Sequence, residues 1–495
     1  MVLSTTFAFA VLSVSSFLCG QGFSQSTNTL QRRSIGTVCQ TIKSSISGAS
    51  TVYFPGGLHY DNDVYHWASS SIEDSVCSVE PGITQDVGII LQILGSTRTP
   101  FAVRGGGHST NKGFSSTPGV QIAMYRFSNV TYNKNTGTAD VGSGLIWDEV
   151  YSALEPFGVS VIGGRVTGVG VAGFTLGGGY SWKTNQFGLT VDTVQAYELV
   201  LPNGTVTSVT ATSNPDLFFG LRGGFNNFGM VTKFTFKTFP QGQVWGGLIT
   251  FTKGVLPQVN DATNKFATTN KDPKAAIITT YNFLLGEPGV SQLLFYDGPN
   301  PPPGIFDDFL AIPFLTKDVS TRSYLSLVQS SPSNATANTR GAFHTVSLTS
   351  YSLNMINVIL NETITRGIDL STFDSGIFIS YDVEPFLPSL FSHGTASAYP
   401  PDRSRGLLPQ NIYYAWTVES ADQDVQNTLR ASANVIRQAA IAEGQVTGNE
   451  AIYGNYALFD TPISSIYGAN VPRLQAIKKQ YDPTNVMGLA GGFKF

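Results

Sequence analysis

Helical and extended hydrophobic patterns alternate along the chain from about residue 77 onward. After Pro81, apolar residues at 87, 90, 91 and 94 recur at helical spacing, and Thr84 stands where an N-cap is expected. An extended run, Pro100–Arg104, follows and leads into three consecutive glycines. Further extended runs separated by glycine-rich turns cover 194–201, 205–209 and 230–239. We therefore predict an α+β fold for this part of the chain.

The stretch after Pro240 has a different character, because its glycine density falls and longer helical patterns appear. Apolar residues between Val425 and Ala440 recur at helical spacing up to Gly444. Beyond residue 450, a last helical pattern stops at Asp482-Pro483 and glycine-rich sequence returns. We expect boundaries near residues 240 and 450, which give segments 25–240, 241–450 and 451–495.

The amino terminus predicts entry into the secretory pathway. Phe7–Leu18 is an apolar run too short to span a bilayer, and small residues follow it, which is typical of a cleaved signal peptide at 1–24. A buried N-terminal strand is the alternative. Cys19 leaves with such a signal, and Cys39 and Cys77 can then pair as a disulfide or remain two buried thiols. Four N-glycosylation sequons stand at Asn129, Asn203, Asn334 and Asn361.

Composition indicates a folded protein, and charge and hydropathy argue against two classes of partner. Hydrophobic residues make up 41% and aromatic residues 12% of the 495 residues, which is too apolar for a disordered chain. The 29 Lys and Arg residues against 33 Asp and Glu residues provide no basic face, so we expect no nucleic acid partner. No later stretch has eighteen uninterrupted apolar residues, so we expect no membrane partner.

Two glycine-rich loops are the strongest candidates for a binding site. The first contains Arg104, Gly105, Gly106, Gly107, His108 and Ser109, and the second, 163–179, has eight glycines in seventeen positions. Successive backbone N–H groups in such loops can surround a phosphate, so a diphosphate cofactor between them is expected. Turn-rich surface loops are the alternative. At the tip of the first loop, His108 either faces this cofactor or is an ordinary packed histidine.

The second loop also contains a deceptive dinucleotide-binding pattern. Gly168-Val-Gly-Val-Ala-Gly173 matches G-x-G-x-x-G, and Asp192 follows about twenty residues later. That fingerprint needs a helix, and Gly177-Gly178-Gly179 should interrupt one within two turns. We therefore do not expect a nicotinamide-binding Rossmann unit. The chain also lacks the P-loop, H-E-x-x-H and G-x-S-x-G signatures, so we expect no metal centre and no serine nucleophile.

At these residues the chain resembles the berberine-bridge-enzyme-like flavoproteins of the vanillyl-alcohol-oxidase superfamily. The resemblance covers nearly the whole chain after the signal. It implies a bipartite PCMH-type FAD-binding domain made from 25–240 and 451–495, and a substrate domain, 241–450, with an antiparallel sheet covered by helices. The motifs that carry it are 78–81, 104–109, 173–179, 187–192, 221–231, 453–456 and 481–485.

The resemblance also implies how FAD is held. The loop histidine of the family, matched by His108, is bonded covalently to the flavin. Val166 stands where many members have a second attachment cysteine, so we expect a single histidyl link. Val169 occupies the place where family oxidases keep a small residue for O2 access, which favours an oxidase. The remaining expected cofactor contacts are Arg104, Gly105, Gly106, Gly107, Ser109, Gly168, Gly173, Gly178, Val231 and Asn455.

For catalysis, the resemblance implies a base that removes the substrate proton. Tyr456 is the candidate base and Tyr453 a substrate contact, both on an expected active-site strand. Because a phenol is a weak base at neutral pH, Tyr456 needs a partner. Asp382 is that candidate, and Glu384, two residues along the same strand face, is the rival. An ordinary packed aromatic and a solvated strand end are the structural alternatives for Tyr456 and Asp382.

Together these features predict a secreted, monomeric FAD-dependent oxidase. It would take hydride from an alcohol, an oligosaccharide or a natural product, and reoxidation by O2 would release H2O2. One alternative is a cyclase or desaturase of secondary metabolism on the same scaffold. A secreted binding or storage protein that has lost catalysis is the other. No motif within 241–450 identifies the substrate.

Overall fold

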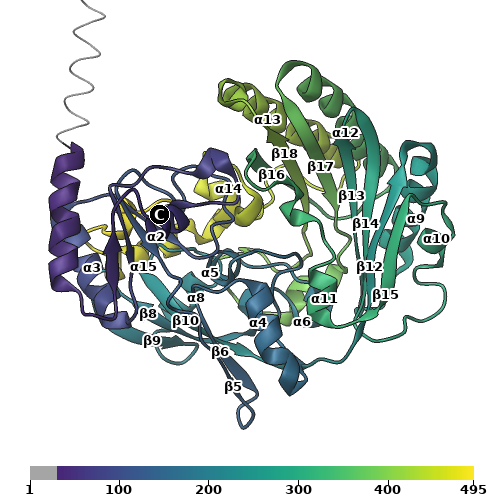
Figure 1. The fold of residues 1–495 in the computed structure, drawn as a ribbon. Helices are drawn as coiled ribbons and strands as arrows, with labels where there is room; N and C mark the ends of the chain where they lie inside the picture. The colour runs from purple at the N-terminus through teal and green to yellow at the C-terminus, as the bar shows by residue number, and fades with distance from the viewer. Residues whose placement is uncertain (1–30) are drawn as a thin grey trace, which may run out of the picture.

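The computed structural model describes residues 31–495, and the chain forms two lobes (Figure 1). The expected signal peptide, 1–24, and Cys19 lie outside the described residues. One lobe contains three small sheets, and the other is built on one large sheet. The expected α+β class is confirmed. None of the helices within 31–495 has the length and apolar character that a bilayer span requires.

A four-stranded sheet carries the first glycine loop. Its order is β1-β2-β4-β3, in which β2, β4 and β3 run parallel and β1 is antiparallel. Helix α3 (Thr84–Thr97) joins β2 to β3, and it begins at Thr84 with Ile83 as N-cap, so Thr84 does not cap it as expected. The strands are β1 (Thr51–Tyr53), β2 (Cys77–Glu80), β3 (Phe101–Arg104) and β4 (Val120–Ala123).

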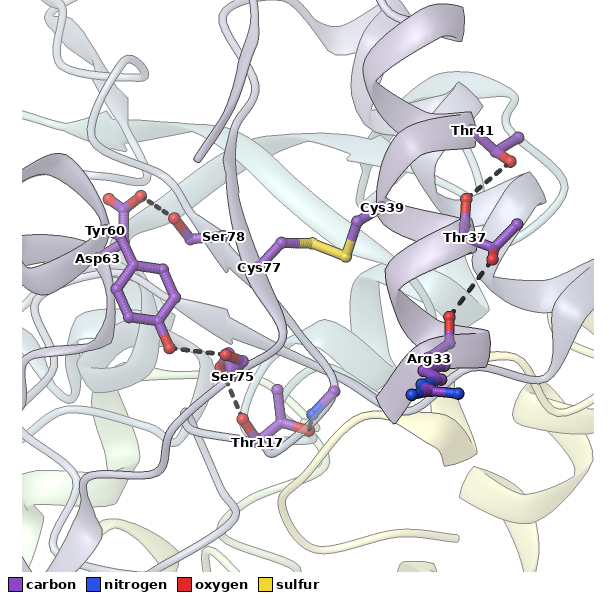
Figure 2. Close-up of a disulfide and its surroundings, with 11 residues drawn as sticks. Arg33, Thr37, Cys39, Thr41, Tyr60, Asp63, Ser75, Cys77, Ser78 and Thr117 are labelled. Carbon is purple, nitrogen blue, oxygen red and sulfur yellow. Dashed lines mark hydrogen bonds between the residues drawn. A yellow bond between two sulfur atoms is a disulfide. The ribbon is translucent and has the colours of Figure 1, made fainter. Parts of the chain in front are cut away.

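The expected Cys39–Cys77 disulfide is present and fixes this sheet to a helix. Figure 2 shows Cys39 on the helix formed by residues 31–45 and Cys77 at the start of β2. Their Cα atoms are 6.3 Å apart, within the range of ordinary disulfides, and both side chains are fully buried. A crosslink over 38 residues contributes about 3–4 kcal/mol by restricting the unfolded chain.

A five-stranded antiparallel sheet completes the core of the same lobe. Its order is β5-β6-β10-β8-β9. Helix α4 (Trp147–Leu154) follows β6, and its buried Trp147 and Leu154 belong to the main hydrophobic core. The strands are β5 (Val130–Asn133), β6 (Thr138–Gly142), β8 (Val194–Val200), β9 (Val206–Thr210) and β10 (Met230–Lys237).

The end of the chain returns to this lobe. Helix α15 (Val471–Tyr481) ends before Asp482-Pro483, as expected, and Asp482 then accepts hydrogen bonds from the backbone N–H groups of Val486 and Met487. Beyond this turn, Ala490 pairs with Phe101 at the start of β3. The last residues therefore lie beside β3, the strand that leads into the first glycine loop, an arrangement compatible with the proposed boundary near residue 450.

The other lobe is a seven-stranded antiparallel sheet of order β15-β12-β14-β13-β17-β18-β16. Helices α9 (Leu256–Thr269), α12 (Leu353–Phe373) and α13 (Asp422–Ala442) cover the face that points away from the first lobe (Figure 1). The opposite face is left to form a cavity. The strands are β12 (Val244–Thr252), β13 (Ala275–Leu284), β14 (Glu287–Tyr296), β15 (Thr316–Arg322), β16 (Arg340–Leu348), β17 (Gly376–Val383) and β18 (Leu408–Trp416).

Candidate active site

A cavity of about 1350 Å³ lies between the two lobes. It exceeds the roughly 300–1,000 Å³ that a single small ligand commonly occupies, so it has room for a cofactor and a substrate together. Both glycine loops, the turn after residue 453 and the C-terminal tail form one side, and the open face of the large sheet forms the other. All the expected cofactor and catalytic residues except Arg104, Gly168 and Gly178 line it.

The first glycine loop, Gly105–Gly107, touches the second loop backbone to backbone. A Cβ atom added at Gly106 would stand 2.6 Å from the Cα of Gly170, so only glycine allows this approach. At Gly107 the backbone φ is +70°, and an added Cβ would stand 2.6 Å from Nε of Arg104. Arg104 therefore lies behind the loop, where its guanidinium packs over the ring of Tyr125.

His108 follows these glycines and faces the cavity. Its ring stacks on Trp67, with centroids 4.5 Å apart and planes 16° apart. The Nε2 atom is buried and has no hydrogen-bond partner among residues 31–495. Burial lowers the pKa of His108 to about 4, which keeps the imidazole neutral near pH 7. A neutral, rigidly stacked imidazole at a cavity wall retains a free nitrogen lone pair, as attachment to a flavin requires.

The second loop is held by Asp148 of α4. Thr167 donates its hydroxyl to Asp148 over 2.5 Å, and the N–H of Gly168, at φ +85°, donates to the same carboxylate over 3.0 Å. A Cβ added at Gly173 would meet no protein atom within 4 Å, so this position opens directly into the cavity. Val166 and Val169 also line the cavity beside it. The cradle thus fits a group that needs close backbone approach.

The second loop does not form a nicotinamide-binding unit. Helix α5 (Val171–Leu176) has six residues and ends at Gly177, as the glycine count predicted. Asp192, which would bind a ribose in that fold, is instead buried between Arg222 and Arg403 at 2.8 and 2.7 Å. Both oxygens of that carboxylate accept hydrogen bonds within the protein and are not available to ribose hydroxyl groups.

Tyr453 and Tyr456 lie on a 3₁₀ turn, Gly454–Tyr456, and the expected strand is wrong here. Because a 3₁₀ turn has three residues, positions 453 and 456 share one face, and the two rings meet edge to face at 5.0 Å. The hydroxyl of Tyr453 accepts hydrogen bonds from Gly179 N–H at 3.0 Å and from Asn455 Nδ2 at 2.7 Å. Asn455 also donates to the carbonyl of Phe174. Tyr453 and Asn455 thus tie this turn to the second loop.

Arg165 is the closest charged partner of Tyr456. Its Nη2 donates to the Tyr456 hydroxyl at 2.9 Å, and its two Nη atoms face both oxygens of Glu384 at 2.8 and 3.0 Å. The Tyr456 hydroxyl stands 3.5 Å from Glu384 Oε1. Both charged side chains are buried, which makes their attraction strong and their separation costly. We call these three residues the Arg165–Glu384–Tyr456 cluster.

The protonation state of this cluster follows from burial and charge. Burial, reinforced by Glu384, raises the pKa of Tyr456 well above its usual value, while Arg165 lowers it. Burial also raises the pKa of Glu384, and Arg165 again opposes that shift. Tyr456 is therefore a neutral phenol in this structure, and Arg165 is the group that stabilises its anion.

Asp382 lies beside this cluster and contacts a different residue from the one expected. Its Oδ2 accepts a hydrogen bond from Asn411 Nδ2 at 2.9 Å, whereas Glu384 is the carboxylate next to Tyr456. Burial, followed by the nearby charge of Glu384, raises the pKa of Asp382 to about 7. Its Oδ1 is buried without a hydrogen-bond partner among the described residues. A catalytic role for Asp382 stays a prediction, and the expected contact with Tyr456 belongs to Glu384.

Sequence reasoning missed Arg165, although one signal was available. Arg165 is the only charged residue within 163–179, in a loop of glycine and apolar residues. A lone charge in such a loop needs a buried partner, but nothing in the sequence names Glu384 as that partner. The four sequon asparagines lie outside the cavity walls and are all exposed.

Two family models match parts of this chain. A model of the FAD binding domain matches residues 76–210, and a model described as "Berberine and berberine like" matches residues 452–490. The chain is 30% identical to the FAD-dependent monooxygenase drtC of Aspergillus calidoustus over 483 residues, which cover 93% of this chain and 90% of that one. It is 41% identical to a FAD-linked oxidoreductase of Arthroderma benhamiae over 257 residues, about half the length of each chain.

One solved structure gives the same fold. The glucooligosaccharide oxidase from Acremonium strictum matches with a TM-score of 0.74 over 92% of this chain and 97% of that chain, at 18% identity. The description of that oxidase gives its cofactor as 6-S-cysteinyl, 8α-N1-histidyl FAD. At this level of identity, the likeness shows the fold alone.

Proposed function

Because the chain belongs to the berberine-bridge-enzyme-like FAD-linked oxidoreductases, we propose that it is a secreted oxidase that removes a hydride and a proton from an alcohol-type substrate. The observation that carries this proposal is the Arg165–Glu384–Tyr456 cluster, which faces the same cavity as His108 and both glycine loops. In this cavity a flavin could accept the hydride from a substrate carbon, while the cluster accepts the proton of the hydroxyl group on that carbon.

The residues present fit FAD. The backbone of Gly105–Ser109 and the open position at Gly173 would hold its pyrophosphate, and Gly491–Phe493 would close the far side of the same wall. His108 would carry the flavin through one covalent link, since Val166 replaces the second attachment cysteine. When bound, FAD would accept the hydride and pass both electrons to O2, giving H2O2. Val169 lines the same cavity at the position where related oxidases keep a small residue for O2 access.

The protein's own part in the reaction is to take the hydroxyl proton. As the substrate C–H bond breaks with its electron pair, the O–H proton must leave so that the C=O bond can form. Tyr456, a neutral phenol at rest, would accept that proton while it passes its own proton to Glu384 Oε1, 3.5 Å away. The 2.9 Å hydrogen bond from Arg165 would stabilise the charge that develops on the tyrosine oxygen during the transfer, and Glu384 would end the step neutral.

A second candidate function is monooxygenation, because a relative that matches nearly the full chain is named a FAD-dependent monooxygenase. The two reactions place oxygen differently. An oxidase reduces O2 to H2O2 and leaves the substrate oxygen unchanged, whereas a monooxygenase puts one atom of O2 into the product. Turnover under ¹⁸O2 therefore separates them, with label in the product favouring the second function. Ring or double-bond formation in the product would indicate the cyclase or desaturase alternative.

The proposal is tested on purified protein from a eukaryotic secretion host. Acid denaturation should leave the flavin attached to the chain, and His108→Ala should release it. His66→Ala, which changes another buried histidine whose partners are Val64 and Ser115, serves as the matched control and should keep the link. A panel of alcohols, sugars and amines should give H2O2 with at least one class. Release of free flavin by the unchanged protein would contradict the covalent link, and a panel without any H2O2 would contradict the oxidase.

A further inference from the structure

The cavity opens at one edge of the large sheet, and that edge is apolar. Leu284 ends β13, Leu285 lies in the turn to β14, Leu315 precedes β15 and Ile377 lies near the start of β17. The strand pairing puts all four at the same end of the sheet, since Leu284 pairs with Phe378 and with Glu287, and Leu315 N–H bonds to Thr250 at the end of β12. We call these four residues the lip.

The lip is exposed and yet belongs to the cavity. Its side chains are 47% (Leu284), 91% (Leu285), 67% (Leu315) and 39% (Ile377) exposed, and all four line the cavity wall. The charged residues of the cavity wall at this end, Lys253 and Glu287, form an ion pair at 2.8 Å and so offset each other's charge. The mouth therefore offers apolar surface and few free hydrogen-bonding groups.

Leu285 has no structural reason to be a leucine. It occupies the first central position of a two-residue hairpin turn at φ +52°, and Gly286 follows at φ +84°. Such turns favour Asn-Gly, because a left-handed backbone is strained for a branched side chain. A residue that is both strained and almost fully exposed adds nothing to the core, which points to a role outside folding.

Two adjacent strands of the sheet, β13 and β17, change character in order between the reactive end and the lip. Along β17 the residues that face the cavity run from Asp382 through Ser380 to Phe378, and along β13 they run from Thr280 to Leu284. On these two strands Asp382 lies at the deep end, the neutral polar side chains of Ser380 and Asn282 lie in the middle, and Phe378 and Leu284 lie at the mouth. Four residues of strand separate Asp382 from Phe378, which is roughly 14 Å.

From this gradient we infer that the substrate is an amphipathic alcohol with its hydroxyl at the Arg165–Glu384–Tyr456 cluster and a long apolar body that rests on the lip. The inference rests on the proposed function and narrows its substrate class. The unpartnered Oδ1 of Asp382 accepts a hydrogen bond from a second donor on the polar end. A chain of sugar units is held mainly through hydrogen bonds, whereas the lip provides four branched aliphatic side chains.

Binding is measured on the flavin-containing protein with two amides that cannot be oxidised, para-octyloxybenzamide and para-methoxybenzamide, through the change in flavin absorbance. Each buried methylene strengthens binding by roughly fourfold, so the octyl compound should bind at least tenfold more tightly. The double variant Leu285→Asn, Leu315→Ser should lose most of that difference and bind the methoxy compound unchanged. Because Asn suits the turn at 285, this variant should fold.

A matched control is Leu58→Asn, which removes a leucine that is 81% exposed at the start of α2 (Leu58–Val64), away from the cavity walls. It should bind both amides as the unchanged protein does. Equal affinity for the two amides, or tighter binding of cellotetraose than of the octyl compound, would overturn the inference. The inference would also be overturned if the lip variants no longer sedimented with phosphatidylcholine vesicles but still preferred the octyl compound, since the lip would then be a membrane-binding surface. These binding measurements need no turnover, so a failure of this inference can be told apart from a failure of the oxidase proposal.

Discussion

One wall of the cavity is made of backbone, and the facing wall is made of side chains. On the loop side, Gly106 and Gly170 touch through their main chains and Gly173 leaves the space above it open. On the sheet side, alternate side chains of β13 and β17 face the cavity, so that a shift of one residue would exchange every one of them. The backbone wall suits a cofactor common to many relatives, and the side-chain wall can differ for each substrate.

The reacting side chain should be the most sensitive position on either wall. Replacing Tyr456 by phenylalanine removes the proton acceptor and keeps the ring packing, so the rate of substrate oxidation should fall by about 10²–10⁴-fold. Stopped-flow measurement of flavin reduction reads this directly. Tyr132→Phe, on β5 and outside the cavity, is the control and should leave the rate unchanged. If Tyr456→Phe kept the full rate, another group would be the acceptor of the substrate proton.

The buried ion pair that joins the two walls should dominate stability. Arg165→Met leaves Glu384 buried without its partner, so the free energy of unfolding should fall by about 3–5 kcal/mol. The double variant Arg165→Met, Glu384→Gln should regain most of this loss in a denaturant titration while its activity stays low. Arg222→Met is the matched control, because Asp192 keeps Arg403 as a second partner and the loss should be smaller. A double variant with normal activity would mean that the cluster only stabilises the fold.

Two glycines on the backbone wall should separate folding from cofactor binding. Gly106→Ala places a methyl group 2.6 Å from Gly170 and should destabilise the protein by about 1–3 kcal/mol, with or without flavin. Gly173→Ala meets no protein atom, so the flavin-free protein should unfold at the same temperature or slightly higher. Its flavin content, measured by absorbance, should nevertheless fall. Full flavin content in Gly173→Ala would show that the cofactor lies elsewhere.

The two walls should also respond to pH in opposite directions, although these effects are the smallest. In the flavin-free protein His108 stays neutral down to about pH 4, while in the unfolded chain it gains a proton below about pH 6.5, so its contribution to stability is lost as pH falls through that window. Asp382 holds its proton up to about pH 7, and the unfolded chain loses it near pH 4, so its contribution is lost as pH rises between those values.

Thermal unfolding of flavin-free protein between pH 4 and 8 tests this difference. His108→Gln should flatten the loss of stability on the acidic side, and Asp382→Asn should flatten the loss towards neutral pH. If each variant changed the unfolding temperature by the same amount at every pH, neither group would titrate as its surroundings suggest.

The same contrast explains what the sequence could and could not predict. Glycine-rich loops depend on residue type alone, so the sequence could locate the loops with Gly105–Gly107 and Gly173, which line the cavity, and the interruption of α5 at Gly177. Their contact with a cofactor stays a prediction. The Cys39–Cys77 pair was also predicted, since only two cysteines remain after the expected signal.

The sheet wall was less predictable, because its contacts join residues far apart in the chain. Asp382 and Glu384 share one face of β17, and only the position of the second loop decides that Glu384 meets Arg165, 219 residues away. The 3₁₀ turn at 454–456 replaced an expected strand for a similar reason, since its geometry is fixed by contacts with Gly179 and Phe174.

The central claim is that one cavity brings a bound flavin and a proton-accepting tyrosine to the same substrate carbon. Anaerobic mixing of the holoenzyme with an alcohol from the H2O2 screen tests it most directly, using substrate with and without deuterium at the carbon that bears the hydroxyl. The account predicts that the yellow colour bleaches, that deuterium slows the bleaching, and that admitted O2 restores the colour with one H2O2 for each flavin. Bleaching that ignores the deuterium, or a flavin that no alcohol reduces, would contradict it.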